Sequence, residues 1–245
     1  MQQYLIFQLY GVLASWGEPA VGESRHSATH PSRSAVLGLL AAAVGIRREQ
    51  EERLEQLSAA LAIGFKVINP GIVLKDYHTV QIPADDRKAK HRHTRRDELR
   101  SDKVGTVLSS REYRQDALSI AAVCLTGQSS GHTLESLAGA LKQPIFQLYL
   151  GRKSCPLSLP SNPKIITAET VTNALDSYEL APEQTRLGST HISYYWEQAL
   201  QTDTAQYSYR VPRYDQPLNR QHWQFAARDE YVRLTTGENH VPKPR

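Results

Sequence analysis

Apolar runs separated by glycine, proline and polar stretches predict the first elements of this chain. Residues 4–10 are mostly aliphatic and aromatic, which predicts a buried strand ending at Gly11. Residues 35–44 are apolar on nearly every side, so we expect a buried helix there that ends at Gly45. Residues 50–63 are apolar on one face only and predict a second, amphipathic helix.

A basic insertion interrupts the segments that follow. The predicted elements, in chain order, are a strand at 65–74 broken by a turn at 69–71, a strand at 117–125, a helix at 134–141 and a strand at 145–150. Without the polar excursion at 78–112, the order becomes β-α-β-β-α-β. This is the ferredoxin-like arrangement of the α+β class, which the RNA-recognition fold shares. Because that arrangement hosts many functions, the order alone assigns no activity.

The composition of the chain changes after residue 155. Prolines at 156, 160 and 163 form a connector, and residues 193–196, 207–211 and 230–234 alternate like strands. We therefore expect two parts. The first is a ferredoxin-like domain over 1–155 with an insertion at about 80–112. The second is a small β-rich region over 156–245 that packs on it.

Charge and cysteine content narrow the function classes. The 245 residues include 29 Lys and Arg against 25 Asp and Glu, a net charge of +4 that permits a nucleic-acid partner without requiring one. Cys124 and Cys155 form no C-x-x-C motif, so neither a zinc site nor a disulfide framework is indicated. The N-terminus does not resemble a signal peptide, and no apolar run has the length of a membrane span. We expect a cytoplasmic protein that makes no membrane contact.

The densest charged stretch is 87–96, with six Lys or Arg, two His and no acid. It is interpreted either as a solvated loop or as a finger that grips single-stranded RNA. On the second interpretation the RNA-binding candidates in it are Lys88, Lys90, Arg92, Arg95 and Arg96. If about six phosphates were neutralised, log K would fall by roughly 4 for each tenfold rise in salt.

Three smaller groups of polar side chains could meet the same ligand. At the base of the finger, Tyr77 could stack on a base and His78 could bind a sugar or phosphate, although a buried His–Asp pair is equally consistent. Before the first helix, Arg25, His26, Ser32 and Arg33 suit an anion, or Ser32 or Ser34 is only the helix cap. After residues 148–150, a glycine turn presents Arg152, Lys153 and Ser154 to a phosphate or a splayed nucleotide, or is simply a solvated turn.

Enzyme motifs are missing from the sequence. It contains no G-x-S-x-G, Walker loop, H-E-x-x-H or G-x-G-x-x-G motif. His26, His30 or His78 with Lys153 or a tyrosine could support acid–base cleavage of RNA through the 2′-hydroxyl. His91 and His93 form an H-x-H pair, but no further ligand is placed to complete a metal site.

Five motifs in order give the chain a resemblance to the CasD family, whose members hold the 5′ handle of the guide RNA in type I-E CRISPR Cascade complexes. The motifs are residues 14–17, Arg25 with residues 29–46, residues 69–71 with 75–79, residues 111–117 and residues 148–156. Beyond residue 156 the resemblance is looser and rests on residues 215–220 and 225–228.

The resemblance implies a RAMP-type fold, with a ferredoxin-like core, a β-hairpin thumb at about 83–111 and a small C-terminal β region. It implies a subunit without catalytic activity or cofactor that binds the crRNA 5′ handle and docks against the neighbouring backbone subunit and the large PAM-reading subunit. Target DNA would be reached indirectly, through the complex. The implied handle-binding residues are Arg25, Ser32, Arg33, Tyr77, His78, Arg152, Lys153 and Ser154, and Arg111 of the fourth motif joins the candidates. The alternative is a metal-independent endoribonuclease that processes repeat RNA, as similar type I-C subunits do.

Overall fold

The computed structural model describes residues 1–83, 93–98, 104–127, 131–185, 187, 191–219 and 224–236. Its strands are β1 (Gln2–Ala14), β2 (Ser24–Arg25), β3 (Leu61–Asn69), β4 (Ile72–Pro83), β5 (Val104–Leu125), β6 (Lys164–Ala168), β7 (His191–Glu197), β8 (Tyr209–Asn219) and β9 (Gln224–Thr236). Its helices are α1 (Arg33–Ala43), α2 (Glu51–Ala60), α3 (Arg95–Glu98), α4 (Leu134–Lys142), α5 (Val171–Asp176), α6 (Pro182–Thr185) and the 3₁₀ turn η1 (Gln198–Leu200).

The strands of the described ranges join one mixed sheet, in the order β6-β1-β5-β3-β7-β9-β8, with β2 and β4 also paired to β5. Strands β1 and β3 both run antiparallel to β5, and the helices α1 and α2 connect them. β7 then extends the sheet beyond β3, and β9 and β8 follow it. The chain is therefore a mixed α/β protein built on a large, mainly antiparallel sheet.

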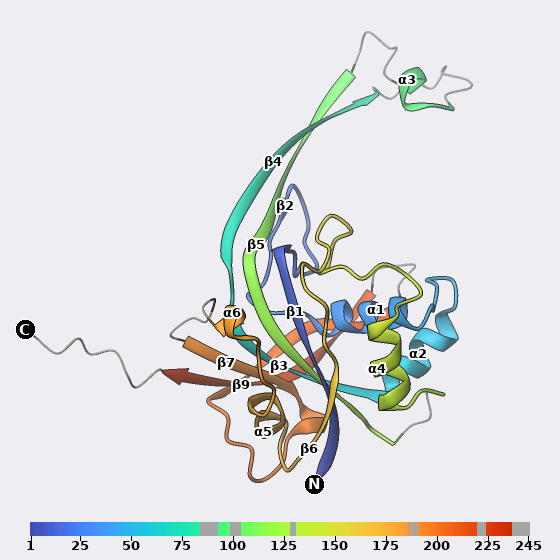
Figure 1. The fold of residues 1–245 in the computed structure, drawn as a ribbon. Coiled ribbons are helices and arrows are strands. Elements are labelled where there is room, and N and C mark those ends of the chain that lie inside the picture. Colours follow the sequence, from blue (N-terminus) through green and yellow to red (C-terminus); the bar gives the residue numbers. More distant parts are fainter. Residues whose placement is uncertain are drawn as a thin grey trace, which may run out of the picture.

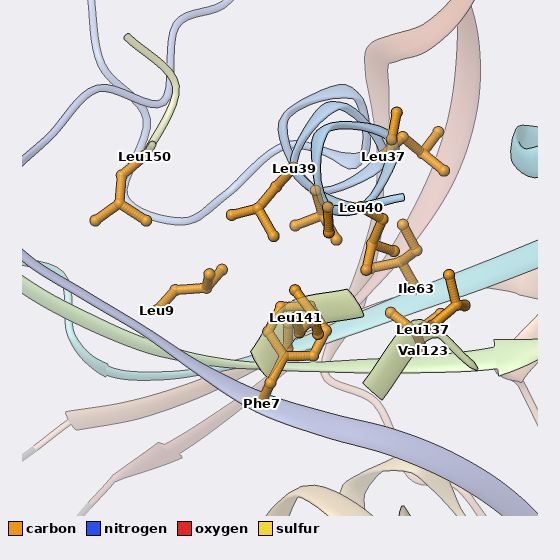
Figure 2. Packing of buried hydrophobic residues seen from close by; sticks show 14 of the residues in the cluster. Phe7, Leu9, Leu37, Leu39, Leu40, Ile63, Val123, Leu137, Leu141 and Leu150 are labelled. Atoms are coloured by element: carbon orange, nitrogen blue, oxygen red, sulfur yellow. The ribbon is translucent and has the colours of Figure 1, made fainter. Parts of the chain in front are cut away.

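Alternating side chains of β1 supply the two faces of this sheet. Leu5, Phe7 and Leu9 lie in a cluster with residues of α1 and α4, whereas Tyr4 and Ile6 lie in a second cluster with residues of α5. Figure 2 shows the first cluster, in which Leu39 and Leu40 of α1 lie on the side of the helix that faces the strands. Removing one such leucine from water stabilises the fold by about 1.5–3 kcal/mol, so the strand alternation holds a helical layer on each face.

A long hairpin leaves the sheet and extends past the rest of the molecule (Figure 1). Its two strands are β4 and the first half of β5, which pair without interruption from Ile72 opposite Gln115 to Pro83 opposite Val104. We call residues 72–83 and 104–115 the arm. Residues 84–92 lie outside the described residues, and with them the candidates Lys88, Lys90 and Arg92.

Several predicted elements are confirmed. The helix predicted at 35–44 is α1, and the helix at 134–141 is α4. The strand at 117–125 is the second half of β5, and those at 193–196 and 230–234 lie within β7 and β9.

Two predicted boundaries and one predicted strand were wrong. The first strand continues through Gly11 to Ala14, and a Cβ on Gly11 would lie 2.7 Å from the Leu150 side chain, so glycine admits a packed neighbour instead of ending the strand. The second helix ends at Ala60, because residues 61–63 already pair with β5. Residues 145–150 form no strand beyond the single bridge of Tyr149 with Pro156, and β6 takes the place beside β1.

Candidate nucleic-acid interface

A cleft of about 960 Å³ opens along α1. The loop after β1, one face of α1, the glycine turn at 149–152 and the β8–β9 hairpin line it. Its lining includes five arginines, namely Arg25, Arg48, Arg111, Arg152 and Arg213, against the two carboxylates of Glu18 and Asp215. Asp215 already pairs with Arg228 and accepts a hydrogen bond from the Arg33 amide. The cleft therefore carries an excess of positive charge, as an anion site requires.

Two of the arginines come from neighbouring strands. The short strand β2 runs parallel to β5 and places Arg25 opposite Arg111. Arg25 is exposed, and its guanidinium donates hydrogen bonds to the carbonyls of Ala20 and Gly22, at 3.1 and 2.7 Å. Arg111 is also exposed. The predicted candidates Arg25 and Arg111 are thus brought together at one wall of the cleft.

His26 belongs to the same loop and is held by a carboxylate. Its Nδ1 lies 3.0 Å from Glu112 Oε1, while the amide of Ser27 donates to Glu112 Oε2. Burial opposes ionisation of Glu112, but these hydrogen bonds and the positive charge nearby lower its pKa below the usual value. Glu112 therefore ties the loop that carries Arg25 and His26 to strand β5.

The start of α1 has a structural role. Ser32 caps the helix by accepting a hydrogen bond from the amide of Ala35, as the simpler interpretation expected. Arg33 is buried, its Nη1 lies 2.6 Å from both carboxylate oxygens of Glu197, and its Nη2 donates to the Ser58 carbonyl. Both side chains are hydrogen-bonded within the chain. Arg33 is therefore not available to a ligand, and Ser32 remains only as a residue that lines the cleft.

The glycine turn brings one predicted cation to the cleft and leaves two residues outside its lining. Gly151 has φ +85°, and a Cβ there would lie 1.8 Å from the Ser15 carbonyl oxygen, so only glycine fits. Arg152 then lies over the Tyr113 ring, 4.9 Å from its centroid, and lines the cleft. Lys153 and Ser154 are exposed on the outer side of the turn.

The arm carries the remaining described candidates. Tyr77 is 63% exposed, and His78 pairs with Asp76 two residues away on a surface where both side chains are partly open to solvent. At the tip, Arg95 pairs with Glu98 at 2.8 Å, and Arg96 is exposed. These residues form a second group, on the arm and in α3 at its tip, and none of them lines the cleft.

Sequence reasoning missed several cleft residues. Arg48 follows α1, Tyr149 precedes the glycine turn, and Arg213 and Tyr214 lie on β8. Tyr214 is 61% exposed. The residues 215–220 had marked this segment as family-like, but nothing in the sequence indicated that β8 would reach α1.

A buried ionic network brings β8 and β9 against α1. Arg228 binds Asp215 through Nε at 2.6 Å and Glu230 through Nη2 at 2.8 Å. Glu230 also lies 3.0 Å from His30, which stacks on Tyr195. Burial raises the pKa of Glu230, but His30, Arg228 and Arg213 outweigh it and lower the value to about 2. The ionised carboxylate of Glu230 therefore links the loop before α1 to the β8–β9 hairpin, which lines the cleft.

Two other site classes can be assessed in the same residues. Among the side chains that the structure describes, no three His, Cys, Asp or Glu are grouped as metal ligands. Within the described ranges, no helix is long and apolar enough to cross a membrane.

An arginine-lined cleft beside a mixed α/β sheet with a projecting arm defines a protein of the anion-binding, nucleic-acid type. The family described as CRISPR-associated protein (Cas_Cas5) matches residues 4–231, and the chain belongs to that family. It is 32% identical to the CRISPR system Cascade subunit CasD of Escherichia coli (strain K12) over 187 residues, which are 73% of this chain and 78% of that protein.

Solved structures have the same fold. A chain of a CRISPR RNA-guided surveillance complex matches with a TM-score of 0.64 and 24% identity, covering 95% of this chain and 90% of that one. A crystal structure of a Cas protein matches with a TM-score of 0.55 and 27% identity, covering 95% and 93%.

Proposed function

We propose that this chain is a guide-RNA-binding subunit of a Cascade-type CRISPR complex in antiviral defence, and that the cleft holds the 5′ handle of the crRNA. The observation that carries the proposal is the cleft itself, where five arginines and only two carboxylates line a space of about 960 Å³. Family membership and the likeness to CasD support the same role.

The arrangement of cations favours a bent single strand over a duplex. The arginines come from five segments around one cleft, so they could meet phosphates from several directions. Tyr149, Tyr214 and Phe225 also line the cleft, and aromatic rings are the groups on which splayed bases stack. Phosphate contacts of this kind hold backbone geometry and leave sequence reading to base pairing.

The fold has a natural interpretation within this proposal. The order β6-β1-β5-β3, with α1 and α2 before β3 and α4 before β6, corresponds to a ferredoxin-like core of the RAMP type. The arm is then the thumb. The division at residue 155 stays a prediction, with the hairpin β8–β9 as the centre of the C-terminal region.

The arm also suits the proposed partners. Ile72, Val73, Val80, Ile82 and Val107 expose between 40% and 75% of their surface there. An apolar surface of this kind beside exposed cations fits a neighbouring backbone subunit that shares the RNA. The large PAM-reading subunit would dock elsewhere on the chain, target DNA would be met through the complex, and the subunit would act in the cytoplasm.

We propose a binding role without turnover. Each of two acid–base candidates is tied to a carboxylate, since His26 pairs with Glu112 beside the cleft and His78 with Asp76 on the arm. Lys153 is exposed and does not line the cleft. Cleavage through the 2′-hydroxyl needs an acid and a base on one phosphodiester. None of His26, His30, His78 and Lys153 lines the cleft, which favours the binding role over the endoribonuclease.

The test is to measure binding of repeat-derived RNA that carries the handle to the wild type and to Arg111→Gln/Arg152→Gln. We expect affinity to fall about tenfold, because two charge-assisted phosphate contacts are lost. Arg53→Gln is the matched control, since Arg53 is exposed on α2 and does not line the cleft. Equal affinity of the double variant and the control, with both folded, would remove the cleft from the RNA site.

A further inference from the structure

Arg213 of β8 has the most unusual environment among the cleft arginines. Its side chain is 14% exposed, and it is held between two carboxylates. Nη1 lies 2.9 Å from Glu18 Oε1 on the outer side, and Nε lies 3.8 Å from Glu230 Oε2 on the inner side. In the described part of the chain its Nη2 is buried and has no hydrogen-bond partner.

The two carboxylates that hold Arg213 differ in how firmly they are placed. Glu230 is 1% exposed and is bound by His30 and Arg228 as well. Glu18 is 52% exposed, and Arg213 is its one described ion-pair partner. Exposed ion pairs contribute little, because water and salt compete for both groups. Glu230 therefore stays beside Arg213, whereas Glu18 is easily displaced from it.

Glu18 also lies in the cleft that would hold the RNA. It lines the cleft together with Arg25, Arg111 and Arg152. A carboxylate beside a bound phosphate repels it, so Glu18 either weakens RNA binding or leaves its place. Of the two acidic side chains in the lining, Asp215 is locked by Arg228 and by the Arg33 amide, which leaves Glu18 as the movable one.

We propose that Arg213 is a further phosphate-binding residue of this cleft and that Glu18 is the carboxylate it exchanges. Glu18 neutralises Arg213 while the cleft is empty, and an RNA phosphate takes over the guanidinium when the cleft fills. The side chain stays in position throughout because Glu230 holds its inner face. This inference rests on the proposed function, since it assigns the residue pair that adapts that site to its RNA.

The exchange has a measurable consequence. The wild type must break the Glu18–Arg213 pair on binding, and Glu18→Gln has no such pair to break. We therefore expect Glu18→Gln to bind handle RNA about fivefold more tightly than the wild type at 0.1 M salt. Glu23→Gln is the matched control, because Glu23 is an exposed acid of the same loop that does not line the cleft. It removes the same charge, and we expect less than a twofold change.

A double-variant cycle isolates the pair. In an Arg213→Gln background, Glu18→Gln should give a clearly smaller gain, because no guanidinium is released and only the repulsion between Glu18 and the phosphates is removed. Thermal unfolding is measured for each variant, and Arg213→Met, which is also uncharged, replaces Arg213→Gln if the latter does not fold. The comparison of Glu18→Gln with Glu23→Gln stands without either of them.

Each outcome decides the matter. A gain in affinity from Glu18→Gln that is clearly smaller in the Arg213 background supports the exchange. Equal effects of Glu18→Gln and Glu23→Gln, or a gain of the same size without Arg213, overturn it while the proposed function stands. If the folded wild type does not bind the RNA at all, the proposed function fails and the exchange fails with it.

Discussion

Replacing Glu230 by glutamine tests the buried network that joins the cleft to the β8–β9 hairpin. The carboxylate is 1% exposed and lies against His30 of the loop before α1, Arg213 of β8 and Arg228 of its own strand. Burial raises the pKa of Glu230, but these groups lower it from 4.5 to about 2. A shift of one pH unit corresponds to about 1.4 kcal/mol, so the ionised carboxylate stabilises the fold by about 3 kcal/mol.

The sign of the pH dependence follows from the direction of that shift. A carboxylate with a lowered pKa contributes its full stabilisation above the unfolded value near 4.5 and loses it as the pH falls through about 2. Glu197 shifts the other way, because burial raises its pKa despite Arg33 nearby, but Glu197 is present in wild type and variant alike. The difference between the two proteins therefore reports Glu230.

The assay is urea unfolding of wild type and Glu230→Gln from pH 7 to pH 2. We expect the variant to be less stable by about 3 kcal/mol at pH 7. The gap should narrow steadily below pH 4.5, as the wild-type carboxyl takes up its proton. Glu179→Gln, at an exposed position, serves as the control and should leave stability unchanged. A gap that stays constant from pH 7 to pH 2 would refute the ionic explanation and leave only a packing effect.

Three further predictions concern the turn, the helix start and the cleft. Gly151→Ala should lower stability by about 2–5 kcal/mol in denaturant unfolding, because φ is +85° and a Cβ would lie 1.8 Å from the Ser15 carbonyl oxygen. Gly127→Ala (φ +90°, with open space around it) should cost only about 1–2 kcal/mol. Equal losses would exclude the contact with the Ser15 backbone as a cause. Arg33→Gln should lower stability by about 3–5 kcal/mol, because Glu197 is left buried without its cation, and an unchanged melting temperature would contradict this. Titration of RNA affinity against salt should give a log–log slope of about −3.5, if all five cleft arginines meet phosphates, and a slope near zero would exclude a polyanion site.

Local pattern predicted the elements whose burial shows in their composition. The helix α1 is apolar on most sides because it packs against the sheet, α2, α4 and β8. The helix α4 is amphipathic and has a capping residue, Thr133, at its start. Tyr194 and Trp196 of β7 and Tyr231 of β9 pack in the cluster on the second face of the sheet. In these segments local preference and tertiary packing agree, so the sequence is sufficient.

The missed features depend on partners that are distant in sequence. Residues 145–150 have strand composition, but Leu148 and Leu150 pack on the first cluster as part of a loop, while the less apolar β6 pairs with β1. Tertiary contact overrides propensity there. Gly11 was assigned as a strand end, although its purpose is to admit Leu150.

The candidate site was predicted in part for the same reason. Arg25 was predicted from its place before a helix, Arg152 from its place on a turn and Arg111 from the family resemblance, and the fold brings them to one cleft. Arg33 has the same charge and a similar position, yet it is buried against Glu197. Arg213 is 180 residues from Arg33 along the chain and joins the cleft only because β8 folds back over α1. Charge alone does not distinguish a buried cation from a ligand-binding one.

The central claim is that the cleft binds RNA without cutting it. The most direct measurement incubates the purified chain with end-labelled repeat RNA that carries the handle, in EDTA, and divides each sample between a binding assay at several salt concentrations and a denaturing gel. The account predicts intact RNA, affinity that falls steeply with salt, and about tenfold weaker binding by Arg111→Gln/Arg152→Gln. A discrete cut in the RNA, or binding that the two substitutions do not weaken, would contradict it.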